Sequence, residues 1–268
     1  MTTETHKLSL GDIEMTVLND GGFTLPSGYF FNLPEEVAAA QEATRSIGAN
    51  LWFIKAGDRR ILVDTGSAEA LRQMFPQTGQ AWDDLRAEDV TDIVLTHMHA
   101  DHIGGLADRA AFPEARIHVA RAEWEFWTQD GLADAVPEDQ RPMILMIQQV
   151  AAGFADRVVL HDGSGELTAG VRFEPLPGHT PGHCGLRLGE GKDAVLIVSD
   201  AVISEDLQFA NPEIGYALDS DAAQAAETRK AMLTACANSG VTIAATHFAF
   251  PGLGKVAQEG EAFRFLPV

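Results

Sequence analysis

Short apolar runs alternate with longer segments of helical periodicity along most of the chain, a pattern that is typical of a mixed α/β fold. Short runs rich in Val, Ile, Leu and aromatic residues, bounded by turn residues, indicate strands. We therefore predict strands at 14–18, 51–54, 61–63, 92–95, 116–119, 171–176, 185–188, 194–198 and 241–244. Asp58 is expected in the turn of a hairpin between the second and third of these strands.

Helical patterns occupy three other segments of the chain. Residues 67–75 and 121–154 carry such a pattern, and residues 219–238, rich in alanine and followed by Gly240, form the clearest helix. No low-complexity linker and no internal repeat interrupts the elements, so we predict one domain spanning residues 1–268. The chain has no run of about 18 apolar residues, so no membrane-spanning helix is expected.

The segment LTHMHADHIGG at 95–105 gathers histidines and an aspartate directly after a predicted strand. His97 and His99 are two residues apart, so they project to the same side of an extended chain, whereas on a helix they would not face each other. Asp101 and His102 follow closely. Burying such side chains without partners would cost about 1–3 kcal/mol for each group, so the pattern favours a metal site over a core.

Three further residues of the metal-ligand type each follow a predicted strand: His179, Asp200 and His247. Each alone would be read as structural, but together with the four earlier residues they predict convergence on metal. Imidazole and carboxylate without thiolate suit zinc, with iron, manganese or cobalt as alternatives. A carboxylate can bridge two ions about 3.5–4 Å apart. We assign His97, His99 and His179 to one ion, and Asp101, His102 and His247 to the other, with Asp200 as the bridge.

With these residues identified, the chain resembles the metallo-β-lactamase superfamily. Residues 97–102 match that family's H-x-H-x-D-H signature, and the three later residues match its His, Asp and His in order. The resemblance extends from about Leu8 to Gly254 and implies an α/β (α+β) fold of four layers, αββα, with the site along one edge of the sandwich. The segment ILVDTGSA at 61–68 is similar to the family's first motif, in which Asp64 would orient a metal ligand.

Within the superfamily, the chain is similar to methyl parathion hydrolase and to acyl-homoserine lactone lactonases. The segments QFANPEIGYALDSDAAQAAETRKAM (208–232) and THFAFPGLGKV (246–256) carry this resemblance. Asp200 argues against a true β-lactamase, because those enzymes lack a bridging aspartate. Many lactonases of the family have a tyrosine three residues after that aspartate, where this chain has Ile203. Tyrosine-assisted lactone opening would therefore need Tyr29 or Tyr216, the two tyrosines of the chain.

The chemistry of such a centre predicts a hydrolase. A water shared by two zinc ions loses a proton near neutral pH and can attack a carbonyl carbon or a phosphorus atom. We assign catalytic roles to Asp101, as a proton carrier, and to Asp200. Aromatic residues at 23–31 and 124–127 could line an apolar pocket. The prediction is a dinuclear zinc hydrolase that cleaves a small lactone, ester or organophosphate triester.

The net charge of −20 weighs against nucleic acid and anionic membranes as partners, and so against a nuclease. A glyoxalase-type thioesterase acting on a glutathione conjugate would need a cationic anchor, and the C-terminal third offers only Arg229, Lys230 and Lys255 before the tail. An iron-dependent sulfur dioxygenase on the same fold is a further alternative; it would keep a single iron, so the number and identity of the bound metal ions would distinguish it from the hydrolase. A binding protein without catalysis is disfavoured because no ligand position is missing.

The remaining expectations concern the setting of the protein. The N-terminal residues lack a basic region followed by an apolar one, so we expect a cytoplasmic protein. Cys184 and Cys236 are then expected to be reduced and buried. Homodimers are common in the family that the chain resembles, which predicts a homodimer with a small-molecule substrate.

Overall fold

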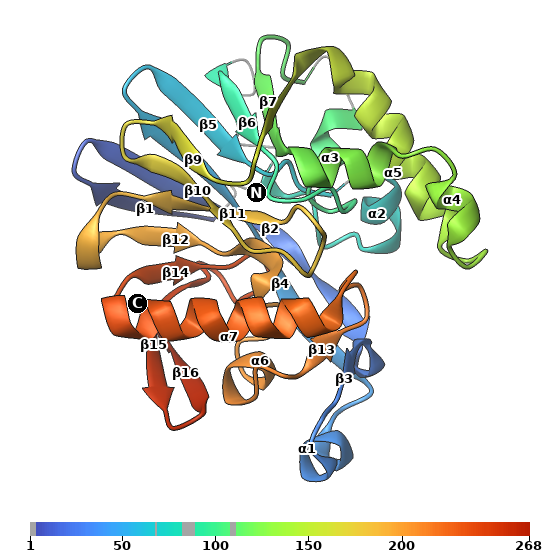
Figure 1. The fold of residues 1–268 in the computed structure, drawn as a ribbon, viewed down its shortest axis with the longest axis vertical. Coiled ribbons are helices and arrows are strands. Elements are labelled where there is room, and N and C mark those ends of the chain that lie inside the picture. Colours follow the sequence, from blue (N-terminus) through green and yellow to red (C-terminus); the bar gives the residue numbers. More distant parts are fainter. Residues whose placement is uncertain (1–3, 68, 82–88, 108–110) are drawn as a thin grey trace.

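A computed structural model describes residues 4–67, 69–81, 89–107 and 111–268, and it shows two large sheets packed face to face (Figure 1). Within the described residues, the first sheet has the order β1 (Thr5–Leu10), β2 (Ile13–Pro26), β4 (Thr44–Ala56), β5 (Arg59–Val63), β6 (Asp92–Val94), β7 (Arg116–Ala120) and β8 (Val158–His161). The second has the order β16 (Ala262–Pro267), β15 (Leu253–Glu259), β14 (Thr242–Ala244), β12 (Val195–Ile197), β11 (Cys184–Leu188), β10 (Val171–Pro175) and β9 (Gly165–Thr168).

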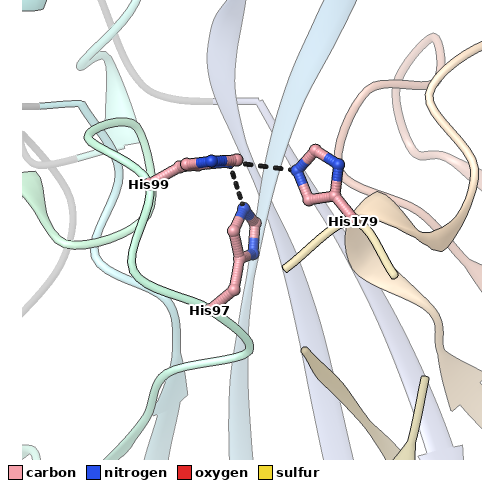
Figure 2. Close-up of side chains that lie close together, drawn as sticks. All are labelled: His97, His99 and His179. Atoms are coloured by element: carbon pink, nitrogen blue, oxygen red, sulfur yellow. Dashed lines mark hydrogen bonds between the residues drawn. The ribbon is translucent and has the colours of Figure 1, made fainter. Parts of the chain in front are cut away.

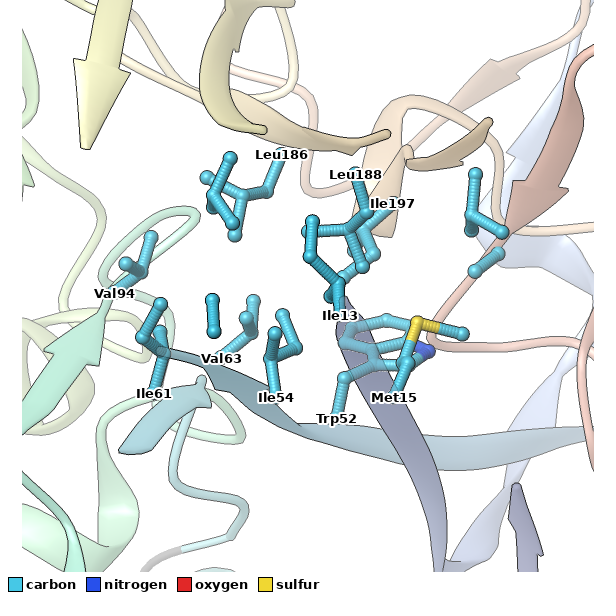
Figure 3. Close-up of a cluster of buried hydrophobic side chains, with 14 of the residues drawn as sticks. Ile13, Met15, Trp52, Ile54, Ile61, Val63, Val94, Leu186, Leu188 and Ile197 are labelled. Carbon is cyan, nitrogen blue, oxygen red and sulfur yellow. The ribbon is translucent and has the colours of Figure 1, made fainter. Parts of the chain in front are cut away.

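Alternating side chains on the strands produce the layers. In β5, Ile61 and Val63 join the core between the two sheets, whereas Leu62 joins a second core on the outer face. In β12, Ile197 likewise faces the inner core and Leu196 faces outward. Figure 3 shows the inner layer, which includes Ile13, Met15, Trp52, Ile54, Leu186 and Leu188.

Helices cover both outer faces of the sandwich. The outer core of the first sheet includes residues of α3 (Arg121–Thr128), α4 (Leu132–Ala135) and α5 (Arg141–Phe154), and that of the second sheet includes residues of α7 (Ala222–Ser239). The αββα arrangement implied by the family resemblance is therefore confirmed. No helix in the described ranges is long and apolar enough to cross a membrane.

Each strand predicted from the sequence lies in or overlaps a strand of the structure, and Asp58 lies in the β4–β5 turn. The helical pattern at 121–154 is confirmed, and the segment divides into α3, α4 and α5, with Gly131 in a left-handed conformation at φ 80° between the first two. The predicted helix at 67–75 is α2 (Glu69–Met74), and residue 68 lies outside the described residues. The helix expected at 219–238 begins at Ala222, because the Asp221 side chain caps it by accepting from Gln224 N.

Several short elements at one end of the sandwich were not predicted. They are β3 (Phe30–Phe31), which pairs with β13 (Gly215–Tyr216), together with α1 (Glu35–Ala40) and α6 (Leu207–Ala210).

The directions of the strands in the second sheet explain why its ligand-type residues lie at one edge. β12 and β14 are parallel, and β10 runs in the same direction because both β10 and β12 are antiparallel to β11. The segments that follow these strands therefore leave the second sheet at the same edge.

Candidate metal centre

The first group of ligand-type side chains joins the two sheets. His97 and His99 follow β6 of the first sheet, and His179 follows β10 of the second. The Nδ1 atom of His99 lies 3.0 Å from Nε2 of His97 and 3.0 Å from Nε2 of His179 (Figure 2). Three imidazole nitrogens thus converge on one point, with His97 and His179 buried and His99 half-buried, which is the arrangement that a transition-metal ion uses.

The second group consists of Asp101, His102 and His247. The Asp101 Oδ2 atom lies 3.6 Å from Nε2 of His102 and 3.6 Å from Nε2 of His247. The Nε2 atom of His102 is buried and has no hydrogen-bond partner among the described residues. A buried polar atom of this kind is costly unless something binds it, so the donor set fits a cation.

Asp200 lies between the two groups. Its Oδ2 atom is 3.0 Å from His247 Nε2, 3.4 Å from His179 Nε2, 3.5 Å from His102 Nε2 and 3.8 Å from His97 Nε2. One carboxylate oxygen therefore faces nitrogens of both groups, as a bridging ligand must. The structure brings all seven residues predicted from the sequence into this one cluster.

The residues that precede three of these side chains are also tied together. Ser199, Thr96 and Thr246 stand directly before Asp200, His97 and His247. The Ser199 hydroxyl lies 3.0 Å from the Thr96 hydroxyl and 3.0 Å from the Thr246 hydroxyl. Three segments from both sheets are thus held in register immediately behind the cluster.

In four of the five imidazoles, the ring nitrogen that faces away from the cluster has a partner that fixes the orientation of the ring. Nδ1 of His102 lies 2.8 Å from Asp64 Oδ2, as the resemblance implied. Nδ1 of His179 lies 2.8 Å from Asp219 Oδ1, a residue that the sequence analysis did not find. The remaining pairs are His247 Nδ1 with Gly48 O at 2.9 Å and His97 Nδ1 with Thr96 Oγ1 at 3.1 Å. Such outer partners are characteristic of metal-binding histidines.

The charge state of the cluster also suits cations. Burial and the neighbouring imidazoles hold the pKa values of His97 and His99 well below their usual range, so both rings are neutral and keep a lone pair. Burial raises the pKa of Asp200, but His247 and His102 outweigh that effect and hold it well below its usual range. The Asp200 carboxylate is therefore ionised.

Aromatic residues close one side of the cluster. The Tyr216 ring stacks on His179 with centroids 6.2 Å apart, and Tyr29 lies 5.9 Å from Tyr216. Burial, followed by the Asp101 and Asp200 carboxylates, raises the pKa of Tyr216 well above its usual value. Ile203, at the position where many lactonases have tyrosine, is buried in the same apolar cluster as Tyr216.

Arg229 cannot serve as an anchor for an anionic substrate. Its side chain is fully buried and donates to the carbonyl oxygens of Ala201 and Pro212 at 2.9 and 2.7 Å. One of its nitrogens lies 3.8 Å from Asp219, the carboxylate that contacts His179 Nδ1, so the Arg229 charge is paired inside the protein. The glutathione-conjugate alternative loses one of its three possible cations.

Comparison with known proteins agrees with this geometry. The family model for the metallo-beta-lactamase superfamily matches residues 46–247. A probable metallo-hydrolase of Mycobacterium tuberculosis is 31% identical over 184 residues, which cover 57% of this chain and 56% of that protein. An N-acyl homoserine lactonase from a Bacillus species is 31% identical over 140 residues, covering 51% of this chain and 48% of that protein. This chain thus spans about half the length of these relatives.

A solved structure is similar over nearly its full length. AidC, described as a dizinc quorum-quenching lactonase in complex with a product, has a TM-score of 0.88 and 26% identity, covering 99% of this chain and 98% of that chain. The family match runs from β4 to His247 and so includes the whole cluster. The chain belongs to the metallo-beta-lactamase superfamily.

Proposed function

We propose that this chain is a hydrolase that binds two zinc ions and cleaves the ester bond of a small substrate, with lactones as the first candidate class. The observation that carries the proposal is the position of Asp200 Oδ2 between two groups of ligand atoms. Lactones come first because AidC and the Bacillus relative are both named as lactonases.

Each ion has its own set of side chains in this proposal. His97, His99 and His179 would hold one, Asp101, His102 and His247 would hold the other, and Asp200 would be shared between them. When bound, zinc supplies a lowered pKa for water and polarisation of the ester carbonyl. The bond between the carbonyl carbon and the ester oxygen breaks as the water oxygen adds, so one proton must reach the leaving alkoxide.

Asp101 is placed to carry that proton. Its side chain is 22% exposed, whereas those of Asp200 and His102 are 3% and 0% exposed. A partly exposed carboxylate can accept a proton from the attacking water and release it to the leaving oxygen. Asp200, enclosed by imidazoles, has no such access.

Tyr216 supplies a second polar contact. A tyrosine phenol is protonated at neutral pH, and this ring stacks on that of His179, so the hydroxyl can donate a hydrogen bond to a substrate oxygen. The neighbouring cluster includes Phe23 and Phe30, and the Phe23 ring lies 5.9 Å from that of His247. These rings offer an apolar wall for an acyl chain or an aryl group.

The test is zinc-loaded protein assayed against an N-acyl homoserine lactone, an aryl ester and a phosphotriester. We expect lactone hydrolysis to be fastest, and Asp200→Ala to lose bound zinc and activity together. Asp193→Ala, at an exposed position near Asp200 in sequence, is the control and should keep both. Inactivity toward all three substrate classes would contradict the substrate assignment. Activity that requires a single iron and consumes oxygen would instead support the dioxygenase alternative.

A further inference from the structure

Glu123 is a fully buried carboxylate on α3, a helix that contributes no side chain to the ligand groups. Its Oε1 atom accepts from Met98 N at 2.9 Å and from Trp127 Nε1 at 2.6 Å. Its Oε2 atom accepts from Thr180 Oγ1 at 2.6 Å and from Gly182 N at 3.0 Å. The two oxygens therefore hold two different loops.

These two loops carry the first ligand group. Met98 stands between His97 and His99, and Thr180 directly follows His179. The first loop leaves the first sheet and the second loop leaves the second sheet. The backbone joins them only at their bases, where Cys184 N donates to Thr96 O at 3.0 Å, so among the described residues this bond leaves the spacing of the loop tips to side chains. Glu123 joins them through a single side chain, one residue away from each of the three imidazoles.

The second loop is seated directly on the helix. A Cβ atom added at Gly182 would lie 2.2 Å from Glu123 N, a distance that side chains do not tolerate. Glycine at this position thus permits the close approach that the hydrogen bond to Oε2 needs. On the other oxygen, Trp127 is held with its ring 5.3 Å from that of His99 at 74°. Glu123 therefore also fixes the aromatic ring against which His99 packs.

The electrostatic setting of Glu123 argues against an incidental role. None of the ion pairs within the described part of the chain involves it, so four neutral donors alone stabilise its charge. Burial raises its pKa, and these four hydrogen bonds oppose that effect. A buried carboxylate without a cation costs several kcal/mol relative to an apolar residue unless hydrogen bonds compensate its charge, and three of the four donors here lie on the two loops while the fourth lies beside His99.

We propose that Glu123 is a positioning residue that sets the spacing of His97, His99 and His179, and thereby the affinity of that one cation site. The inference rests on the proposed function, because it requires that the cluster binds cations. It distinguishes the two sites, since no hydrogen bond from Glu123 reaches the segment 101–102 or the segment that carries His247 within the described residues.

The experiment is a zinc titration of the full chain against a chromophoric chelator, combined with urea unfolding of the metal-free protein. In Glu123→Gln the amide offers one acceptor oxygen to four donors. We expect one zinc equivalent to bind 10- to 100-fold more weakly, with the other near its wild-type affinity. Glu125→Gln, on the exposed face of the same helix, is the matched control and should leave both equivalents unchanged.

Milder variants keep the test decisive if Glu123→Gln does not fold. Thr180→Val and Trp127→Phe each remove one donor, and each should weaken the same equivalent severalfold. Thr128→Val, which loses only a hydrogen bond to Trp124 O, is their control. Equal weakening of both equivalents, or lower unfolding free energy at unchanged zinc affinity, would overturn the positioning role. A wild-type chain that binds no zinc would instead overturn the proposed function.

Discussion

Replacing Asp64 with asparagine tests whether its carboxylate orients the metal-ligand candidate His102. Asp64 is fully buried, and its Oδ1 atom accepts from Thr96 N at 2.8 Å. Its Oδ2 atom lies 2.8 Å from the Thr96 hydroxyl and 2.8 Å from His102 Nδ1. The backbone at Asp64 has a φ of 59°, which asparagine adopts readily, so the change acts through the side chain alone.

The magnitude follows from counting donors. An amide has one acceptor oxygen, and if that oxygen faces His102, the Thr96 N–H meets the new NH₂ group. The Thr96 N–H and the new NH₂ group are then two unpaired buried donors, at about 1–3 kcal/mol each. The free energy of unfolding should therefore fall by about 2–6 kcal/mol. Without the carboxylate on His102 Nδ1, zinc affinity at the Asp101–His102–His247 group should fall 10- to 100-fold.

Asp92→Asn is the matched control. Asp92 is also fully buried and lies 2.8 Å from a histidine nitrogen, His118 Nε2, but it begins β6 whereas the ligand segment follows that strand. Urea unfolding of metal-free protein should show a stability loss in both variants. Zinc titration should show weaker binding in Asp64→Asn only. Equal zinc affinity in the two variants would refute the assignment of Asp64 to the orientation of His102.

Three other predictions concern separate parts of the molecule. Burial holds the pKa of His161 at about 4, below its value of about 6.5 in the unfolded chain, so the unfolded state binds more protons between these values and stability falls as the pH drops through that window. His161 is only partly buried, so we expect the fall in stability from pH 7 to pH 4.5 to be about 1–2 kcal/mol smaller in His161→Asn than in the wild type. Urea unfolding in chelator at the two pH values measures this difference, and equal pH dependence in the two proteins would contradict the prediction. Tyr216→Phe should lower kcat/KM for a lactone about 10-fold or more at unchanged zinc content, whereas Tyr29→Phe should change it less than about twofold, and an unaltered rate in the first variant would exclude the hydroxyl from the reaction. Asp219→Asn should weaken the zinc equivalent held by His179 about 10-fold or more in the chelator titration, and wild-type affinity would show that the Nδ1 contact is dispensable.

The seven clustered residues could be found from the sequence because each follows a recognisable strand. His179, Asp200 and His247 would each be read as structural alone. Because each follows a predicted strand and four more ligand-type residues lie at 97–102, the seven together predict a metal site although they are far apart in the chain. Asp64 could be found through its motif. The alternation of Ile61, Leu62 and Val63 between the two cores likewise explains why β5 was predicted correctly.

The supporting residues could not be found in this way. Glu123 and Glu125 occupy the same EWEFW segment, and their spacing does not show which one is buried. Asp219 stands two residues before the helix cap Asp221, and either carboxylate suits a cap by sequence. Glu123 and Asp219 differ from their neighbours because each contacts the loop at 179–180, more than 35 residues away in the chain, and local sequence patterns do not encode such a contact. The edge strands β1 and β16 escaped prediction because polar residues interrupt their apolar pattern.

Metal content measured alongside activity tests the central claim most directly. Elemental analysis of purified, active wild-type protein should give about two zinc ions per chain, and Asp200→Ala should lose both bound zinc and hydrolysis. Hydrolysis by protein that contains no transition metal would contradict the account, as would full activity of zinc-replete Asp200→Ala.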